Sequence, residues 1–315
     1  MLSRRGFVNG TIGAGIALAA QGQARAQTAA PARKRMIVDA QVHLWTAETP
    51  EWRWVPGRPP QLPEPFTIEK LVALMDEAGV DRVVVVPPSW PGDRNDYGLE
   101  AARRHPERFR VMGRIPLEKP ESAALLPKWK QQPGMVGVRV TFLGPLAAWA
   151  SDGTADWFWP AAEKAGLPVM FLAPGNGAAF ARIAERHPAL TLIIDHMNLT
   201  ADIKKNNQTD GAIDQTVALA KYPNVSCKLS ASPGHSSEAY PFGDMTPVLK
   251  RVFDAFGPQR CYWGTDMTNS FAKATYRQRV THFTETLDFL SEDDKCEYKA
   301  SFDSTCSETR WAVYS

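Results

Sequence analysis

The order of apolar and polar segments along the chain predicts a repeating strand–helix architecture. The run RVVVVPP at residues 82–88 is almost entirely β-branched, which is typical of a strand buried on both faces of a sheet. Before it, residues 67–78 carry apolar side chains at three- and four-residue spacing up to Gly79, which is typical of an amphipathic helix that ends at a glycine. The same succession continues along the chain, so we predict an α/β protein.

Eight strand-then-helix units are predicted, and strict alternation implies parallel strands joined by helical crossovers. Eight units over roughly 280 residues favour a closed (β/α)8 TIM barrel in a single domain over an open doubly wound sheet. The GxGxxG motif that usually follows the first strand of an open sheet is absent. The predicted strands are residues 36–38, 82–88, 111–117, 136–142, 168–172, 190–195, 225–229 and 261–264; the predicted helices are 67–78, 95–105, 122–131, 156–165, 178–186, 213–220, 246–256 and 276–290.

Residues 1–26 have a different composition from the rest of the chain. Arg4-Arg5 precedes an apolar, glycine- and alanine-rich run over residues 11–20, and Ala24-Arg25-Ala26 offers a cleavage site. This segment resembles a twin-arginine (Tat) export signal, which is removed from the mature protein. We therefore expect export to the periplasm, with residues 27–35 as a linker and 36–315 as the barrel. A chance arginine pair in a disordered N-terminus is the alternative.

Charge and cysteine content narrow the range of partners. A net charge of +2 over 315 residues gives no reason to expect nucleic acid. No stretch after the signal approaches the length of a membrane span, so we expect no span in the mature protein. A small-molecule substrate is expected, and a homo-oligomer is left open. Cys227 and Cys261 lie in strand-like runs and are expected to be buried and free. A bridge between Cys296 and Cys306 is left open, since no CxxC or metal-ligand spacing is present.

The stretch MIVDAQVHLW at residues 36–45 is where polar chemistry first follows a buried strand. Asp39, Gln41 and His43 occupy alternate positions. In an extended chain, alternate side chains lie on one side of the pleat. The sequence therefore predicts that a carboxylate, an amide and an imidazole project together from the end of the first strand.

Polar residues also follow most of the later strands, whose carboxyl ends carry the chemistry of a barrel. They are Ser89 and Trp90 after the second strand, Arg114 after the third, Arg139 in the fourth, Asp195 and His196 after the sixth, Lys228 in the seventh and Asp266 after the eighth. Singly, each has an ordinary structural explanation, because such aspartates cap turns and Arg139 and Lys228 could pair with buried carboxylates. Two of the six histidines at strand ends, with an aspartate at the last, favour a catalytic site.

Six segments carry a resemblance to a known family: DAQVHLW at 39–45, NDYGLEAARRHPERF at 95–109, VGVRVTF at 136–142, LIIDHMN at 192–198, CKLSA at 227–231 and YWGTDM at 262–267. Together they resemble the amidohydrolase superfamily, in particular its amidohydrolase-2 group, which includes lactonases and aromatic-acid decarboxylases. The resemblance extends over nearly the whole mature chain and implies a hydrolase.

The sequence departs from that family at the metal site. The family usually opens with Asp-x-His-x-His, but Gln41 stands in the place of the first histidine, and the fifth strand ends in Phe171-Leu172-Ala173-Pro174 with no histidine. Catalytic zinc takes about three protein ligands, and an amide is a poor substitute for imidazole. We therefore expect a site that needs no metal. One divalent ion such as zinc or manganese, held by His43, His196 and Asp266, is the alternative.

The metal-free branch of the family hydrolyses lactones, and the resemblance implies a role for each strand-end residue. Asp266 would act as general base on a water, while His43 and His196, with the Gln41 amide, donate to the developing oxyanion. Arg139 suits a substrate carboxylate because its planar fork binds that group bidentately. Lys228 could assist or be structural. Trp45, Trp90 and the tryptophan-rich segment 45–54 would form an apolar wall or lid.

Three functions follow, in order of preference. The first is metal-independent opening of a lactone or cyclic ester, with a carboxylated substrate. The second is a mononuclear metal-dependent hydrolase or decarboxylase. The third is an exported binding protein that has kept the barrel and lost the chemistry.

Overall fold

Eight parallel strands form the centre of the computed structural model, which describes residues 36–295. The predicted signal, the predicted linker, Cys296 and Cys306 lie outside the described residues. The strands pair in sequence order, and the backbone N–H of Asp266 donates to the Gln41 carbonyl (2.9 Å), which joins the last strand to the first. The strands are β1 (Val38–Val42), β2 (Arg82–Val85), β3 (Phe109–Gly113), β4 (Met135–Thr141), β5 (Val169–Leu172), β6 (Leu192–Ile194), β7 (Val225–Ser230) and β8 (Cys261–Gly264).

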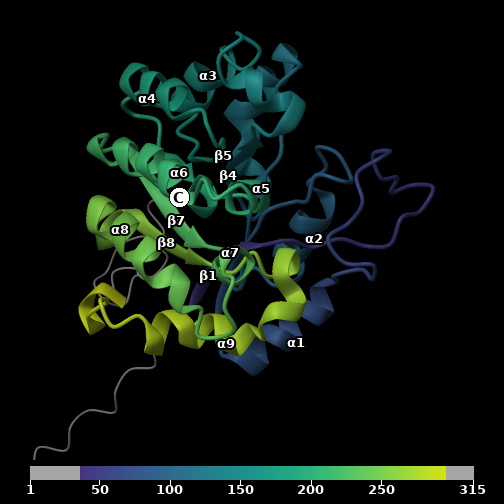
Figure 1. Cartoon of the computed structure of the whole chain (residues 1–315). Coiled ribbons are helices and arrows are strands. Elements are labelled where there is room, and N and C mark those ends of the chain that lie inside the picture. The colour runs from purple at the N-terminus through teal and green to yellow at the C-terminus, as the bar shows by residue number, and fades with distance from the viewer. Residues whose placement is uncertain (1–35, 296–315) are drawn as a thin grey trace, which may run out of the picture. The chain divides into compact units, whose positions relative to one another are not determined.

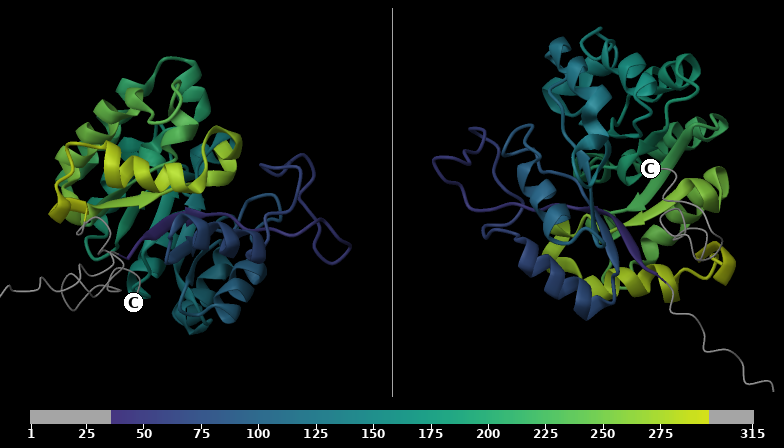
Figure 2. Two further views of the ribbon diagram at one scale, coloured as in Figure 1. Left: turned by 90° about the horizontal axis from the view of Figure 1, so that it is seen from below. Right: turned by 180° about the vertical axis from the view of Figure 1, so that it is seen from behind.

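Helices follow the strands and surround them, so the predicted (β/α)8 barrel is confirmed (Figures 1 and 2). The α-helices are α1 (Ile68–Ala78), α2 (Asp96–Arg104), α3 (Phe158–Lys164), α4 (Gly177–Arg186), α5 (Ala201–Lys205), α6 (Thr209–Val217), α7 (Ser232–His235), α8 (Thr246–Phe256) and α9 (Tyr276–Thr281). In the described part of the chain, no helix is both long and apolar enough to cross a membrane.

Local sequence explains where several elements begin and end. Thr67 caps α1 by accepting from the Lys70 N–H, and Gly79 ends the helix at φ 75°, a left-handed conformation that glycine adopts without a Cβ clash. The predicted helix at 122–131 is a 3-10 helix, η1 (Pro120–Gln131), with Pro127 inside it. Proline lacks the N–H that an α-helix needs there.

The predicted closing helix over 276–290 is shorter than expected. Its α-helical part ends at Thr281, and a π-helical turn over His282–Thr286 follows. Thr286 Oγ donates to the His282 carbonyl (2.8 Å) and also contacts its Nδ1 (3.0 Å). These side-chain bonds compete with the regular ladder, which is why the helix does not continue to residue 290.

The hydrophobic core is divided by the strands into two clusters. One consists of strand and strand-end residues only and fills the barrel interior: Val38, Ala40, Val84, Val86, Met112, Val136, Met170, Ile193 and Tyr262. The other lies between the strands and the helices and includes Cys227 and Cys261, which are buried and free as predicted. Because the interior is filled at this level, any substrate site must lie above it, at the strand ends.

Candidate active site

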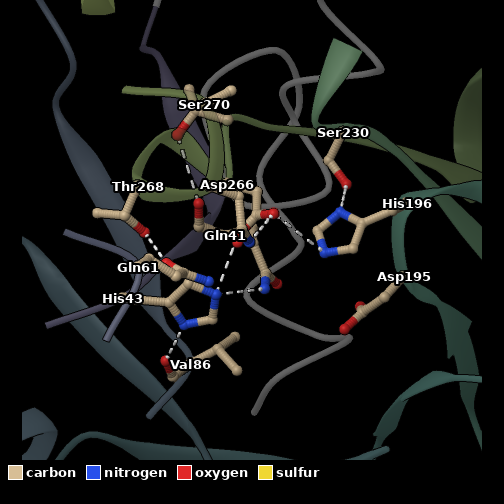
Figure 3. A network of polar contacts seen from close by, with 12 residues as sticks. Gln41, His43, Gln61, Val86, Asp195, His196, Ser230, Asp266, Thr268 and Ser270 are labelled. Atoms are coloured by element: carbon tan, nitrogen blue, oxygen red, sulfur yellow. Dashed lines mark hydrogen bonds and ion pairs between the residues drawn. The ribbon is translucent and has the colours of Figure 1, made fainter. Parts of the chain in front are cut away.

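His43, His196 and Asp266 meet at the carboxyl ends of β1, β6 and β8, in the wall of a cavity of about 340 Å³ (Figure 3). Asp266 lies between the two imidazoles. Its Oδ1 is 2.9 Å from His43 Nε2, and its Oδ2 is 3.6 Å from His196 Nε2. The three side chains converge on one concave surface, as a catalytic group must.

The backbone holds Asp266 in a left-handed conformation directly after β8, at φ 45°. Aspartate is one of the few residues other than glycine that enters this region readily. Asn269, three residues further on, donates from Nδ2 to Asp266 Oδ2 (2.6 Å). One oxygen of the carboxylate is therefore held by an amide, and the other faces His43.

His43 is oriented by the neighbouring strand end. Its Nδ1 lies 2.6 Å from the Val86 carbonyl, which only accepts, so Nδ1 carries a proton. Gln41 Nε2 lies 3.5 Å from His43 Nε2. The ring is therefore fixed so that Nε2 faces both the carboxylate of Asp266 and the Gln41 amide.

His196 lies in an unusual backbone segment. His196, Met197 and Asn198 have φ values of 50°, 57° and 57°. Three consecutive left-handed residues other than glycine are strained, and strain of this kind persists where the surroundings determine it. Asn198 Oδ1 accepts from the Ala173 N–H (2.9 Å), and His196 Nδ1 contacts Ser230 Oγ (2.7 Å). The strained turn thereby aims Nε2 of His196 at Asp266.

Burial and charge set the protonation of the pair. Burial acts to raise the pKa of Asp266, but the charge that His196 carries at acid pH and the hydrogen bond with His43 outweigh it and hold that pKa below its usual range. Burial lowers the pKa of His196 to about 4. At neutral pH the site therefore contains an ionised carboxylate beside a neutral His196.

A buried charge network lies behind the cavity wall. Lys228 and Asp195 are fully buried, with Nζ 2.7 Å from Oδ1, and Arg139 Nε donates to the other oxygen of Asp195 (3.0 Å). Lys228 also donates to Gln41 Oε1. The ordinary structural explanation, pairing with a buried carboxylate, therefore holds for both cations. Arg139 lines the cavity as well, whereas Lys228 and Gln41 lie behind its lining.

Asp39 does not share a face with Gln41 and His43, so that prediction was wrong. The register of β1 against β2 shifts between Asp39 and Val42, and such a bulge reverses the direction of the following side chains. Asp39 accepts from Thr265 Oγ (2.6 Å) and from the Tyr276 hydroxyl (2.8 Å). It ties β1 to the segment that precedes Asp266 and to α9, and it does not line the cavity.

The predicted aromatic wall is present in part. Trp90 lines the cavity, but Trp45 is fully buried behind it, with ring centroids 4.9 Å apart in an edge-on arrangement. From the loop 46–65, which extends past α2 in Figures 1 and 2, the residue that lines the cavity is Gln61 rather than a tryptophan. Thr268 Oγ donates to Gln61 Oε1, which holds this loop against the β8 end.

His235, which sequence reasoning missed, also lines the cavity, from the end of α7. Its Nε2 is buried without a hydrogen-bond partner among the described residues, and burial lowers the His235 pKa to about 3. Its position after the seventh strand, in SPGH, was the available signal, but His235 lies at the far end of a short helix and not at the strand end itself. A neutral imidazole with a free nitrogen is available to a ligand.

The side chains at the strand ends include residue types that can bind a metal ion. Between residues 36 and 295, no group of three or more His, Cys, Asp or Glu is arranged to hold a metal ion. His43 contacts Asp266 directly, and the Gln41 amide oxygen is taken by Lys228. The arrangement of these side chains does not fit a metal centre with three protein ligands.

Comparisons with known proteins agree with the fold and the family. The family model "Amidohydrolase" matches residues 38–296. An L-fucono-1,5-lactonase of Burkholderia ambifaria is 27% identical over 73% of this chain and 79% of its own length. A 4-sulfomuconolactone hydrolase of Hydrogenophaga intermedia is 28% identical over 67% of each chain. A crystal structure of a zinc-bound amidohydrolase from Burkholderia multivorans superposes with TM-score 0.72 at 19% identity, over 86% of this chain and 98% of that one.

Proposed function

The chain belongs to the amidohydrolase family and is a hydrolase, and from the geometry of its site we propose that it opens a lactone or related cyclic ester with water. The observation that carries the proposal is the ionised Asp266 held between two imidazoles in the wall of the cavity. The names of the two curated relatives, both lactone hydrolases, support the same reaction class.

In the proposed reaction, Asp266 takes a proton from a water as the water oxygen bonds to the ester carbonyl carbon. The carbonyl electron pair moves to its oxygen, which receives hydrogen bonds from the Nε2–H groups of His43 and His196. For His43, whose Nδ1 proton is bound by the Val86 carbonyl, this requires a proton on both ring nitrogens. For His196 this requires the tautomer in which Ser230 donates to Nδ1 and Nε2 carries the proton. Collapse of the tetrahedral intermediate breaks the ring C–O bond, and protonated Asp266 returns its proton to the leaving alkoxide. The product is a hydroxy acid.

A carboxylated substrate fits the charge of the wall. Arg139 lines the cavity, and its Nε is already held by Asp195, so the guanidinium is fixed in place before a substrate binds. A bidentate pair with a carboxylate would anchor the substrate on the β4 side. Trp90 offers an apolar face to the ring on the β2 side. Behind the lining, Gln41 and Lys228 support His43 and Arg139.

The decisive experiment is a panel of lactones and esters assayed with and without a chelator. We expect hydrolysis of at least one lactone at an unchanged rate after chelation, and no stoichiometric metal in the purified protein. A stoichiometric ion whose removal abolishes turnover would support a mononuclear metal enzyme, hydrolase or decarboxylase, instead. Release of CO2 from a carboxylated substrate separates these two.

Asp266→Asn separates an enzyme from a binding protein. The amide keeps the size of the side chain but cannot take the proton from water, so we expect turnover to fall at least ~1000-fold with ligand affinity unchanged. Equal activity of the variant would exclude Asp266 as the base. If neither protein turns over any substrate although both bind one, the non-catalytic alternative stands.

Export remains part of the proposal, supported by the twin-arginine pattern of residues 1–26. We propose that the mature protein lies in the periplasm. Fractionation of cells that express the full chain, beside a variant with Arg4 and Arg5 replaced by lysine, tests this. The variant should stay in the cytoplasm uncleaved, and an unchanged distribution would contradict the assignment.

A further inference from the structure

A second, smaller cavity of about 100 Å³ adjoins the candidate active site at the ends of β3 and β4. Arg139 and Thr141 line both cavities, so the two spaces lie side by side at these residues. Arg114, directly after β3, forms another wall of the smaller cavity. We call this space the side cavity.

Arg114 is buried with part of its guanidinium unused. It is 8% exposed, and its Nη1 has no hydrogen-bond partner among residues 36–295. Its Nε lies 3.3 Å from Asp93 Oδ1, a long contact with a carboxylate whose side chain is 34% exposed. The backbone of Arg114 is held on both sides by Asn95, through bonds of 2.7 Å and 3.0 Å. The backbone of Arg114 is thus held in place, and its side chain is incompletely paired.

Thr141 offers a second unused group in the same space. Its Oγ is buried and has no hydrogen-bond partner within the described part of the chain. A buried donor without a protein partner is costly to a fold unless water or a bound ligand satisfies it. Here two such groups, one of them cationic, line one cavity next to the candidate catalytic centre.

The charge around the side cavity favours an anion. Its lining contains three cations and two carboxylates: Arg58, Arg114, Arg139, Asp93 and Glu118. Asp195 pairs with Arg139 but is shared with Lys228. Burial, followed by the charge of Arg139, lowers the pKa of Arg114 to about 10. Positive charge therefore exceeds negative charge at this end of the site.

We propose that the side cavity is a subsite for an anionic substituent of the substrate, a carboxylate or sulfonate carried on the lactone ring. Arg114 Nη1 and Thr141 Oγ donate to its oxygens beside the Arg139 guanidinium, and the ring lies in the larger cavity. The inference rests on the proposed lactone hydrolysis and adds two residues that determine specificity. It excludes an uncharged sugar lactone as the best substrate.

The test compares an acidic lactone with its carboxamide, in the wild type and in Arg114→Gln. We expect the variant to lose at least ~100-fold in kcat/KM on the acid, mainly through KM, and less than ~3-fold on the amide. Arg103→Gln, which removes an exposed charge from α2, is the matched control and should change neither. Equal losses on acid and amide would mean that Arg114 only supports the fold, and would overturn the subsite.

Anion binding can be measured without any hydrolysis, so it tests the side cavity independently of the proposed function. Benzoate and benzenesulfonate should raise the melting temperature of the wild type and of Arg103→Gln equally, and that of Arg114→Gln, which keeps only Arg139, by less than half as much. If no lactone is hydrolysed while this pattern holds, the reaction is wrong and the anion site stands. Thr141→Val provides a second variant should Arg114→Gln unfold, with an expected loss of about 10-fold on the acid alone. An unchanged acid-to-amide ratio there would also overturn the subsite.

Discussion

Lys228 Nζ lies 2.7 Å from Asp195 Oδ1, and neither side chain is exposed to solvent. The ammonium comes from β7 and the carboxylate from the end of β6, so the ion pair joins two adjacent strand ends below the candidate catalytic residues. Arg139 contacts the other oxygen of the same carboxylate. The Arg139 guanidinium, which faces the substrate cavity, is thus positioned through a residue that a substrate does not reach.

Lys228→Met should destabilise the protein strongly. Removing one partner leaves the buried charge of Asp195 paired with Arg139 alone, which costs about 3–5 kcal/mol in the free energy of unfolding. Urea denaturation measures this. Lys250→Met, which removes an exposed lysine paired with Asp254 on α8, is the control and should change the free energy by about 0.5 kcal/mol or less. Equal small effects of the two substitutions would show that the network is not needed for stability.

Ser230→Ala should slow the reaction by releasing His196. The Ser230 hydroxyl contacts His196 Nδ1 at 2.7 Å, and its loss removes the contact that selects the Nε2–H tautomer. We expect a fall in kcat of about 10-fold or more with little change in KM, and partial recovery in Ser230→Thr. Ser226→Ala, on the same strand, is the control. A loss confined to KM would contradict the positioning role of Ser230.

The acid limb of kcat/KM should lie below pH 5. Asp266 must be ionised to accept a proton, and its pKa is held below the usual range. His196 keeps the Nε2 proton that it donates both when neutral and when protonated, below about pH 4, so Asp266 sets the limb. Activity should therefore be flat from pH 5 to pH 8 and fall at lower pH. Asn269→Ala removes a hydrogen bond to the carboxylate, so it should raise the Asp266 pKa and move the limb upward by roughly one unit. A limb that does not move in this variant would argue against Asp266 as the titrating base.

Stability should decrease as pH falls from 6.5 toward 4. Burial lowers the pKa values of His196, His235 and His282 to about 4, about 3 and about 4, from 6.5 in the unfolded chain. Over this range the unfolded state binds more protons than the folded state. The contribution of these histidines to the free energy of unfolding is therefore complete above pH 6.5 and is lost as the pH falls. Melting temperatures measured across this range test the direction.

His282→Phe offers a check on that assignment, because His282 lies away from the candidate active site, packed against Phe242 and Phe283. The substitution removes one of the three buried groups that gain a proton on unfolding. The slope of stability against pH should decrease by about one proton between pH 6.5 and 4. An unchanged slope would show that His282 does not contribute to the acid sensitivity.

Sequence periodicity was enough to predict the barrel, because a strand buried on both faces and a helix buried on one face leave different apolar patterns. The residues at strand ends could be predicted for a similar reason, since parallel strands bring their carboxyl ends to one side of the sheet. His43, His196, Asp266, Arg139 and Trp90 all line the cavity as expected. Each lies within a few residues of a strand, where local order decides its position.

Predictions failed where position depends on something other than the end of a regular strand. The bulge in β1 turns Asp39 away from Gln41 and His43, and strict alternation does not anticipate an extra residue. Trp45 has the chemistry of a binding site but is covered by neighbouring elements, and of the two roles left open for Lys228, its ion pair with Asp195 favours the structural one. Gln61 and His235 reach the cavity from a long loop and a short helix, whose paths depend on contacts distant in sequence.

The sequence by itself determined the barrel, the family and the meeting of one carboxylate with two imidazoles, because each of these follows from local patterns repeated around a closed sheet. Tertiary structure alone decided which charges are paired and which polar groups are left unpaired. Asp195 is satisfied by Arg139 and Lys228, while Arg114 Nη1 and Thr141 Oγ have no partner among the described residues. Pairing depends on distances between side chains from different strands, and no pattern along one chain contains those distances.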